Sequence, residues 1–220
     1  MDDEEYYHDI VPKKTIYLHH TAGGHRPDWT IGGWERDTTR IGAVRHVATA
    51  FLIGGKSIRD GSQDWDGKIL ECLPPEKWAH HLGTNARNNR NLNKESIGIE
   101  ICNYGQVDVR DGVYFNYVNN IVAAEDVIDL GYFHRGFRYY HAYTDAQIES
   151  TRKLVLDLGN RFNIDVSKGM KSILNANGDV FALNKKALAG DEGIWTHTNV
   201  RKDKNDLSPQ PKMINMLSQL

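Results

Sequence analysis

Four short segments rich in β-branched and other apolar residues constrain the fold of this 220-residue chain most strongly. Each has the length and composition of a buried β-strand. They cover residues 15–19, 47–53, 68–73 and 96–102. Between the second and third segments, residues 54–61 are rich in glycine, which favours a turn and an antiparallel connection. We therefore expect a sheet of at least four strands.

The clearest helix begins near residue 144. Thr144 and Gln147 have the T-x-x-Q spacing of a capping box, and apolar side chains then recur on one face as far as Phe162. The tail from Pro211 to Leu220 has the pattern of a closing amphipathic helix. We expect the first of these helices to pack across the sheet.

Two further helices are expected from weaker patterns. One lies within residues 116–130 and is ended by Gly131, and a shorter one covers residues 29–37. No Pro-rich or Ser-rich linker divides the chain. Short strands followed by helices favour a single α/β or α+β domain built in layers.

Composition excludes several classes of protein. Lys and Arg number 27 against 29 Asp and Glu, so the net charge of -2 does not suggest a nucleic-acid partner. Cys72 and Cys102 lie outside any C-x-x-C pattern, which argues against a disulfide scaffold or a Cys-rich zinc site. Residues 2–5 are all acidic, unlike a secretory signal, and no apolar run could span a bilayer. We expect cytoplasmic synthesis without a signal peptide, and no insertion into membranes.

Histidines mark the first and last candidate sites. His19 and His20 end the first strand, where alternation lets only one of them face a given cleft. His197 precedes Asp206 through a polar loop long enough to bring both onto one ion with a distant histidine. Three ligands and an open fourth position are the arrangement of catalytic zinc. Alone, the first motif is more often the polar end of a strand, and the second a solvated loop.

Two other segments could carry chemistry. Glu100 lies within the fourth strand, on the face opposite Ile99 and Ile101, where a carboxylate is costly unless it is paired, hydrogen-bonded or functional. An exposed sheet face is the simpler reading for a single glutamate. Residues 77–85 combine Trp78 with two histidines, which suits a loop that contacts a ligand or, equally, a packed tryptophan beside surface histidines.

In this order the four motifs resemble the zinc-dependent N-acetylmuramoyl-L-alanine amidases of the amidase_2 type. This family is shared by bacteriophage T7 lysozyme, the bacterial AmpD amidase and the animal peptidoglycan recognition proteins. Residues 16–22 match the family's I-x-x-H-H-T-A strand, and residues 96–100 match its S-I-G-I-E strand. His197, Lys204 and Asp206 match its closing histidine followed by K-x-D. The motifs frame residues 15–210, nearly the whole chain.

The resemblance implies an α/β fold in which a central mixed sheet is flanked by helices. It also implies one catalytic domain over residues 1–220, with a core at about 14–220, a long insertion at about 103–144 and no separate cell-wall-binding domain. The insertion contains an aromatic and basic run, residues 132–140, which could line a groove for glycan or peptide or simply pack the extra segment.

The resemblance also assigns site residues. Zinc would be held by His19, His197 and Asp206, with Glu100 as general acid/base and Lys204 stabilising the oxyanion. Expected substrate contacts are His81, Thr49, Trp78 and Asn85. Thr49 stands where some members have a tyrosine near the metal, which favours Glu100 for the proton transfers. The usual A-W-H-A-G turn is replaced by residues 79–83, so whether His81 alone contacts substrate is left open.

The implied reaction is hydrolysis of the amide between N-acetylmuramic acid and L-alanine in bacterial peptidoglycan. We expect a monomeric, bacteriolytic enzyme of the phage endolysin type that acts on the cell wall after release. One alternative is a cytosolic recycling amidase acting on soluble anhydro-muropeptides. Another is a peptidoglycan-binding module without catalysis, which would commonly lack a metal ligand. A metalloprotease is a weaker alternative because the chain has no H-E-x-x-H.

Overall fold

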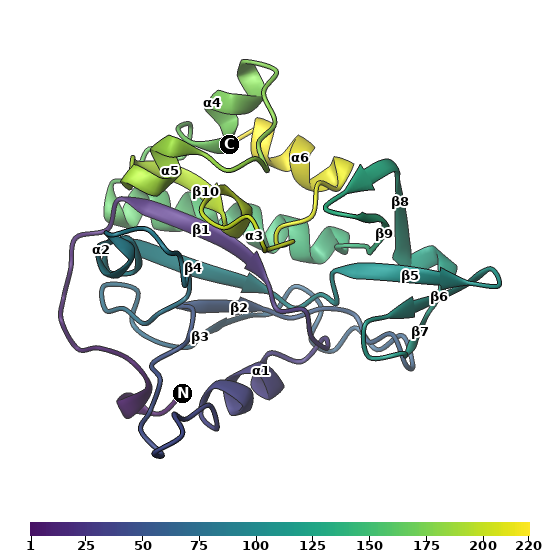
Figure 1. The fold of residues 1–220 in the computed structure, drawn as a ribbon, viewed down its shortest axis with the longest axis horizontal. Helices are drawn as coiled ribbons and strands as arrows, with labels where there is room; N and C mark the ends of the chain where they lie inside the picture. The colour runs from purple at the N-terminus through teal and green to yellow at the C-terminus, as the bar shows by residue number, and fades with distance from the viewer.

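A central five-stranded mixed sheet organises the computed structural model, which describes all 220 residues (Figure 1). The strand order is β10-β1-β4-β2-β3. The strands are β1 (Thr15–His20), β2 (Phe51–Ile53), β3 (Ile69–Glu71), β4 (Ser96–Ile101) and β10 (Gly193–Thr196). Four of them are parallel to their neighbours, and β3 is antiparallel to β2. The expected fold class and the antiparallel connection after the second strand are confirmed.

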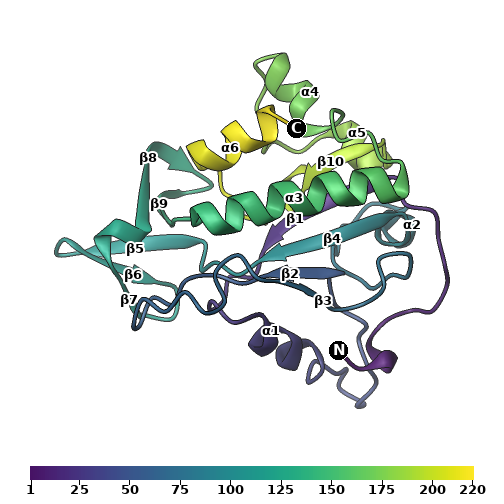
Figure 2. The same ribbon diagram turned by 180° about the vertical axis from the view of Figure 1, so that it is seen from behind.

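The two faces of this sheet differ in what packs against them. Ile16, Leu18 and Ile99 point to one face, where they join a core of 25 buried residues. This core includes side chains of α3 (Asp145–Phe162) and α6 (Pro211–Ser218). Figure 2 shows α3 lying across the sheet on that side. The alternating residues point to the opposite face, where Tyr17 and Trp195 join a smaller buried cluster and where His19 and Glu100 lie beside one another.

The predicted capping box of α3 is present. The Thr144 hydroxyl accepts a hydrogen bond from the backbone N–H of Gln147, and the Gln147 side chain accepts one from the backbone N–H of Thr144. These bonds satisfy donors that a helix start otherwise leaves unpaired. The same hydroxyl donates to the Asp66 carboxylate, 2.6 Å away. The cap thus anchors α3 to the loop before β3.

Thr144→Ala is expected to lower the free energy of unfolding by about 1 kcal/mol, because it removes the cap and leaves donors unpaired. In a chain of this length that corresponds to a loss of roughly 2–4 °C in melting temperature. Thermal unfolding followed by circular dichroism measures the change. Thr144→Ser keeps the hydroxyl and is the matched control, so an equal loss in both variants would contradict the role given to the cap.

The remaining helices are short. They are η1 (Asp3–Glu5), α1 (Pro27–Trp34), α2 (Asn89–Lys94), η2 (Ala124–Asp126), α4 (Met170–Asn175), α5 (Lys185–Ala189) and η3 (His197–Asn199). The expected helices near residue 29 and in the tail are confirmed as α1 and α6. Helix α1 packs through Ile31 and Trp34 near Leu52, Cys72 and Cys102, and both cysteines are buried and free. None of the helices is both long and apolar enough to cross a membrane.

Residues 103–144, the expected insertion, form a second, antiparallel sheet that extends from one end of the first (Figure 1). Its strand order is β7-β6-β5-β9-β8. The strands are β5 (Gln106–Arg110), β6 (Val113–Asn116), β7 (Ile121–Val122), β8 (Val127–His134) and β9 (Phe137–His141). Together they contain most of the residues between the end of β4 and the start of α3.

The helix expected within residues 116–130 is wrong, because this segment contains a tight turn and parts of three strands. The Asn116 side chain accepts hydrogen bonds from the backbone N–H groups of Val118 and Asn120, which fixes a turn where a helix would need continuous backbone pairing. Asn119 adopts a positive φ of 61° in the same turn. Gly131 lies at an irregularity within β8 and does not end a helix.

Candidate metal and active site

The candidate site lies where neighbouring parallel strands of the central sheet end. His19 on β1 is the register partner of Glu100 on β4, so the two side chains share one face. His197 directly follows β10, the other neighbour of β1. Carboxyl ends of parallel strands meet at one edge of a sheet, where ligand sites commonly form. Residues distant in sequence are thereby brought together.

The three predicted metal ligands converge. The Nδ1 atoms of His19 and His197 lie 3.1 Å apart. The Asp206 Oδ2 atom lies 3.1 Å from Nδ1 of His19 and 3.0 Å from Nδ1 of His197. All three side chains are buried, with 1%, 5% and 8% of the His19, His197 and Asp206 surfaces exposed. The arrangement is a nearly equilateral triangle of two nitrogens and one oxygen.

This donor set fits zinc. Zinc bound by histidine and carboxylate has ligand distances of about 2.0–2.2 Å, which in a tetrahedron separates the ligand atoms by about 3.3 Å. The Nε2 atom of His197 is 2.7 Å from the Leu82 carbonyl oxygen, to which it donates, so Nδ1 of this ring carries a lone pair. A lone pair and a carboxylate oxygen that face one another in a buried site repel, and a metal cation bound between them relieves this repulsion.

Electrostatics around the triangle agree with a neutral His19 and an ionised Asp206. Burial lowers the pKa of His19 to about 4, although Asp206 opposes this shift. Burial likewise holds the pKa of His81, which lies behind His19, well below its usual range. For Asp206, burial works against ionisation, but His197 and His19 together hold its pKa well below its ordinary value. Neutral histidine and ionised aspartate are the forms that bind a metal ion.

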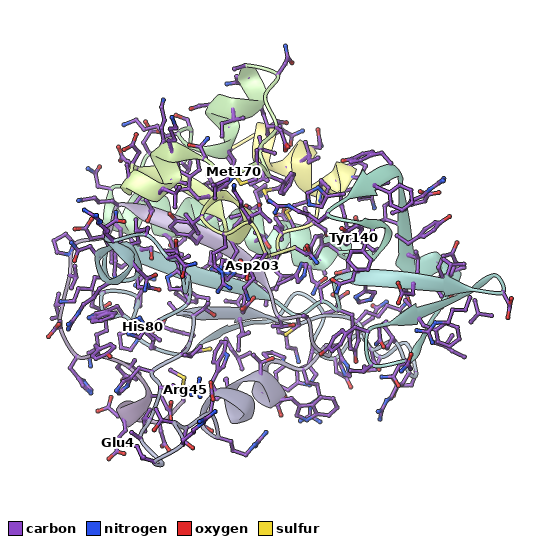
Figure 3. All side chains as sticks on the ribbon, in the orientation of Figure 1. Glu4, Arg45, His80, Tyr140, Met170 and Asp203 are labelled. Atoms are coloured by element: carbon purple, nitrogen blue, oxygen red, sulfur yellow. The ribbon has the colours of Figure 1, made fainter.

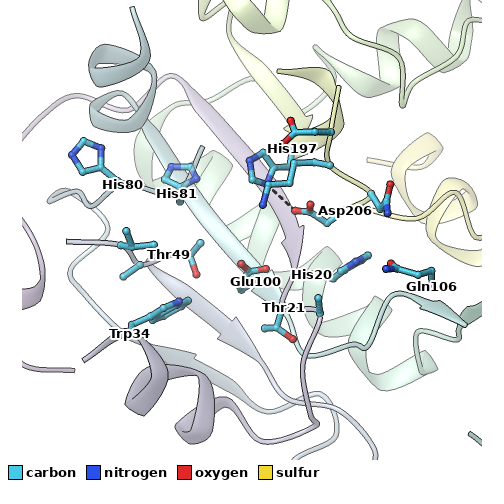
Figure 4. Close-up of a pocket in the computed structure, with 16 residues that line it drawn as sticks. His20, Thr21, Trp34, Thr49, His80, His81, Glu100, Gln106, His197 and Asp206 are labelled. Atoms are coloured by element: carbon cyan, nitrogen blue, oxygen red, sulfur yellow. Dashed lines mark hydrogen bonds and ion pairs between the residues drawn. The ribbon is translucent and has the colours of Figure 1, made fainter. Parts of the chain in front are cut away.

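A cavity of about 330 Å³ opens beside the triangle (Figure 4). Its lining includes His197 and Asp206 from the metal site, together with Glu100, Lys204 and Thr49. His80 and Asp203 also line the cavity. Figure 3, which draws the whole molecule in the orientation of Figure 1, labels Asp203 near its middle. The cavity therefore joins the expected catalytic residues to the metal site.

Glu100 points into this cavity (Figure 4). Burial, together with the nearby Asp206 carboxylate, raises the pKa of Glu100 well above its usual value, against the opposing effect of Lys204. Its Oε2 atom is buried and has no hydrogen-bond partner within the protein. A buried carboxylate oxygen without a partner is costly, and such groups occur where a ligand or a reaction uses them.

Lys204 is the one lysine or arginine among the residues that line the cavity. It lies in the loop between His197 and Asp206, two residues before the aspartate. Its ammonium group has no ion-pair or hydrogen-bond partner in the structure, whereas the neighbouring Asp203 is paired with Arg201. An unpaired cation beside the metal site is available to stabilise negative charge on a bound substrate.

The four expected substrate contacts divide into two pairs. Thr49 and His81 line the cavity. Trp78 does not, because it is only 2% exposed and Tyr7 stacks on its ring with centroids 3.9 Å apart. Asn85 is exposed and borders a separate groove with Arg201 and other residues of the late loop. The structure therefore does not bring Trp78 or Asn85 to the cavity beside the metal site.

Several residues near the site were not predicted. His20 borders the cavity as well as His19, and its Nδ1 atom lies 2.9 Å from the Tyr143 hydroxyl. Ser96 and Asn93 support residues 81–82 from behind the site. The S-I-G-I-E motif contains Ser96, but its spacing alone does not reveal which side chain its hydroxyl meets.

Solved structures with the same fold include two bacterial proteins. AmiD from E. coli, an N-acetylmuramyl-L-alanine amidase in complex with the substrate anhydro-N-acetylmuramic acid-L-Ala-D-gamma-Glu-L-Lys, is 17% identical with a TM-score of 0.52. The match covers 96% of this chain and 58% of that chain. AmpDh3 from Pseudomonas aeruginosa is 18% identical with a TM-score of 0.52, covering 100% of this chain and 65% of that one. At these identities the likeness concerns the fold.

No curated protein matches the sequence. The family model for N-acetylmuramoyl-L-alanine amidases, Amidase_2, does match, and it covers residues 10–211. This range contains every predicted metal ligand and both expected catalytic residues. The chain belongs to the Amidase_2 family of N-acetylmuramoyl-L-alanine amidases.

Proposed function

We propose that this protein hydrolyses the amide bond between N-acetylmuramic acid and L-alanine in peptidoglycan, with zinc held by His19, His197 and Asp206. The observation that carries the proposal is the buried triangle of ligand atoms beside a cavity that also contains Glu100 and Lys204. Family membership supports the same reaction. The structure of AmiD, which shares the fold, contains a muropeptide with this type of bond.

Each residue of the site has its own role in the proposed reaction. Zinc, when bound, supplies a Lewis acid that acidifies water and polarises a carbonyl group. Glu100 accepts a proton from the attacking water and delivers it to the departing amine of L-alanine. Lys204 holds its positive charge beside the carbonyl oxygen, where negative charge develops in the transition state. His19, His197 and Asp206 would hold the ion.

Glu100→Gln is expected to lower kcat by about two orders of magnitude while zinc remains bound, because the amide cannot accept the proton. Release of free amino groups from purified peptidoglycan measures the rate, and elemental analysis measures zinc. Glu95→Gln, at the partly exposed residue before β4, is the matched control. Loss of zinc together with an unchanged rate per bound zinc would instead assign Glu100 to support of the metal.

We further propose that the substrate is intact peptidoglycan, as for a phage-type endolysin, and that one monomer suffices. All ligands and both catalytic residues come from a single chain. The second sheet favours a polymeric substrate, since Gln106 on β5 lines the cavity and Tyr132 and Phe133 on β8 are 52% and 74% exposed. Extra surface beside a cleft is more useful on a polymer than on a small fragment.

Loss of turbidity of purified sacculi or chloroform-treated Gram-negative cells tests this role. We expect the wild-type protein to clear these preparations and Glu100→Gln to clear them about 100-fold more slowly. Rapid cleavage of soluble anhydro-muropeptides without clearing of sacculi would favour the recycling alternative. Zinc binding and peptidoglycan binding without any cleavage would favour a recognition module.

A further inference from the structure

A continuous chain of hydrogen bonds runs behind the candidate ligand His19. Its Nε2 atom lies 3.1 Å from Nδ1 of His81. Nε2 of His81 lies 2.8 Å from the Ser96 hydroxyl oxygen. That hydroxyl is in turn 2.6 Å from the backbone carbonyl oxygen of Leu92. Four groups therefore connect the metal site to the backbone of α2.

The direction of every hydrogen bond in this chain is set by its last member. A carbonyl oxygen only accepts, so the Ser96 hydroxyl must donate its single proton to Leu92. The Ser96 oxygen must then accept from Nε2 of His81, and Nδ1 of the neutral His81 ring carries a lone pair. This lone pair accepts the Nε2–H of His19, which leaves the lone pair of His19 on Nδ1, the atom of the metal triangle.

Packing keeps His81 at this position. A Cβ atom on Gly98 would lie 3.1 Å from Nδ1 of His81 and 2.8 Å from the Thr49 methyl group. The glycine of the S-I-G-I-E motif therefore leaves the space that His81 occupies. Both ring nitrogens of His81 are engaged, so neither is free to bind a polar group of the substrate.

The residue after His81 holds the second candidate histidine. The Leu82 carbonyl oxygen accepts from Nε2 of His197, at 2.7 Å. The backbone N–H groups of His81 and Leu82 both donate to the side-chain oxygen of Asn93, at 2.7 and 3.0 Å. Asn93 is completely buried. His81 and Leu82 are thus both held by Asn93, and each contacts the Nε2 atom of one metal-site histidine, His81 that of His19 and Leu82 that of His197.

We propose that His81 and Leu82, fixed by Ser96 and Asn93, form a positioning bracket that sets both histidines of the metal site with Nδ1 toward the ion. This proposal rests on the zinc site of the proposed function. It gives His81 a role through His19 in place of the expected contact with substrate. Groups that orient a ligating histidine in this way contribute about 10- to 100-fold in metal affinity.

Three variants and a metal-affinity measurement test the bracket. His81→Leu removes the acceptor for His19 and is expected to weaken zinc binding by about 10- to 100-fold, measured by competition with a chelator of known affinity. Ser96→Ala frees His81 to adopt either tautomer and is expected to weaken binding less. His81→Asn places a carbonyl oxygen near the former Nδ1 and is expected to recover most of the affinity.

Cobalt(II) provides a readout that a purely structural role would not change. The visible absorption of the cobalt-substituted protein reports the geometry of the ligands, so it should shift in His81→Leu and return toward wild type in His81→Asn. Ser150→Ala, on α3, is the matched control. The Ser150 hydroxyl also donates to a backbone carbonyl, that of Gly67, at 2.6 Å. This variant should leave both zinc affinity and the cobalt spectrum unchanged.

The outcomes separate this proposal from the proposed function. Tight zinc binding that His81→Leu weakens and His81→Asn restores supports the bracket, even if the wild-type protein cleaves no amide. Wild-type zinc affinity and an unchanged cobalt spectrum in both His81→Leu and Ser96→Ala would overturn the bracket, whatever the activity. Equal loss in His81→Leu and His81→Asn would overturn the assigned hydrogen bond. A wild-type protein that binds no zinc would overturn both proposals.

Discussion

Replacement of His197 with alanine is expected to abolish stoichiometric zinc binding and to reduce amide hydrolysis by three orders of magnitude or more. The substitution removes one of the three candidate ligands from the buried triangle, and Asp206 loses its contact with Nδ1 of His197. Metal-ion catalysis contributes several kcal/mol of transition-state stabilisation, so its loss is large compared with that of any single hydrogen bond.

Elemental analysis of the purified variant and its rate of amine release measure these two effects. His8→Ala is the matched control, because His8 is exposed and lies on the N-terminal segment near Asp3. The fold should persist, because the core of 25 buried residues is assembled on the other face of the sheet. Full activity in His197→Ala would exclude this residue from the metal site.

Removal of the Lys204 ammonium group is expected to lower kcat by roughly 10²- to 10³-fold with little change in zinc content. Lys204 has no ion pair to lose, so Lys204→Ala should leave the stability of the protein nearly unchanged. The charge acts on the oxyanion, which exists only near the transition state, and kcat should fall more than KM changes.

Single-turnover rates with zinc-saturated protein measure this effect. Lys202→Ala, at an exposed position two residues earlier, is the matched control. Lys204→Arg keeps the charge and should recover part of the rate. If Lys204→Ala instead raised KM with an unchanged kcat, the residue would serve ordinary substrate binding and not the transition state.

Four strands of the central sheet and the capping box of α3 could be predicted from the sequence because their determinants are local. Runs such as residues 15–19 and 96–102 are strongly β-branched, and Thr144 with Gln147 carries a complete capping box. His197 and Asp206 lie in one loop, and their spacing fits a shared ion. Taken alone, however, that loop is more often solvated, so the assignment of all three ligands, His19 included, required the resemblance to a known family.

Other features depend on contacts between distant residues. The sheet within residues 103–144 was predicted partly as a helix, because a turn held by the Asn116 side chain is not visible in hydrophobic periodicity. Trp78 was expected to contact substrate, but Tyr7, 71 positions earlier, covers its ring. The contact between His81 and His19 spans 62 positions and follows only from the folded chain.

Mass spectrometry of purified muropeptides incubated with the zinc-loaded protein tests the central claim most directly. We expect the muramoyl sugar and a stem peptide with a free N-terminal L-alanine to appear together, and both to form about 100-fold more slowly with Glu100→Gln. Muropeptides that stay intact with zinc-loaded wild-type protein, or that are cleaved at a peptide or glycosidic bond instead, would contradict it.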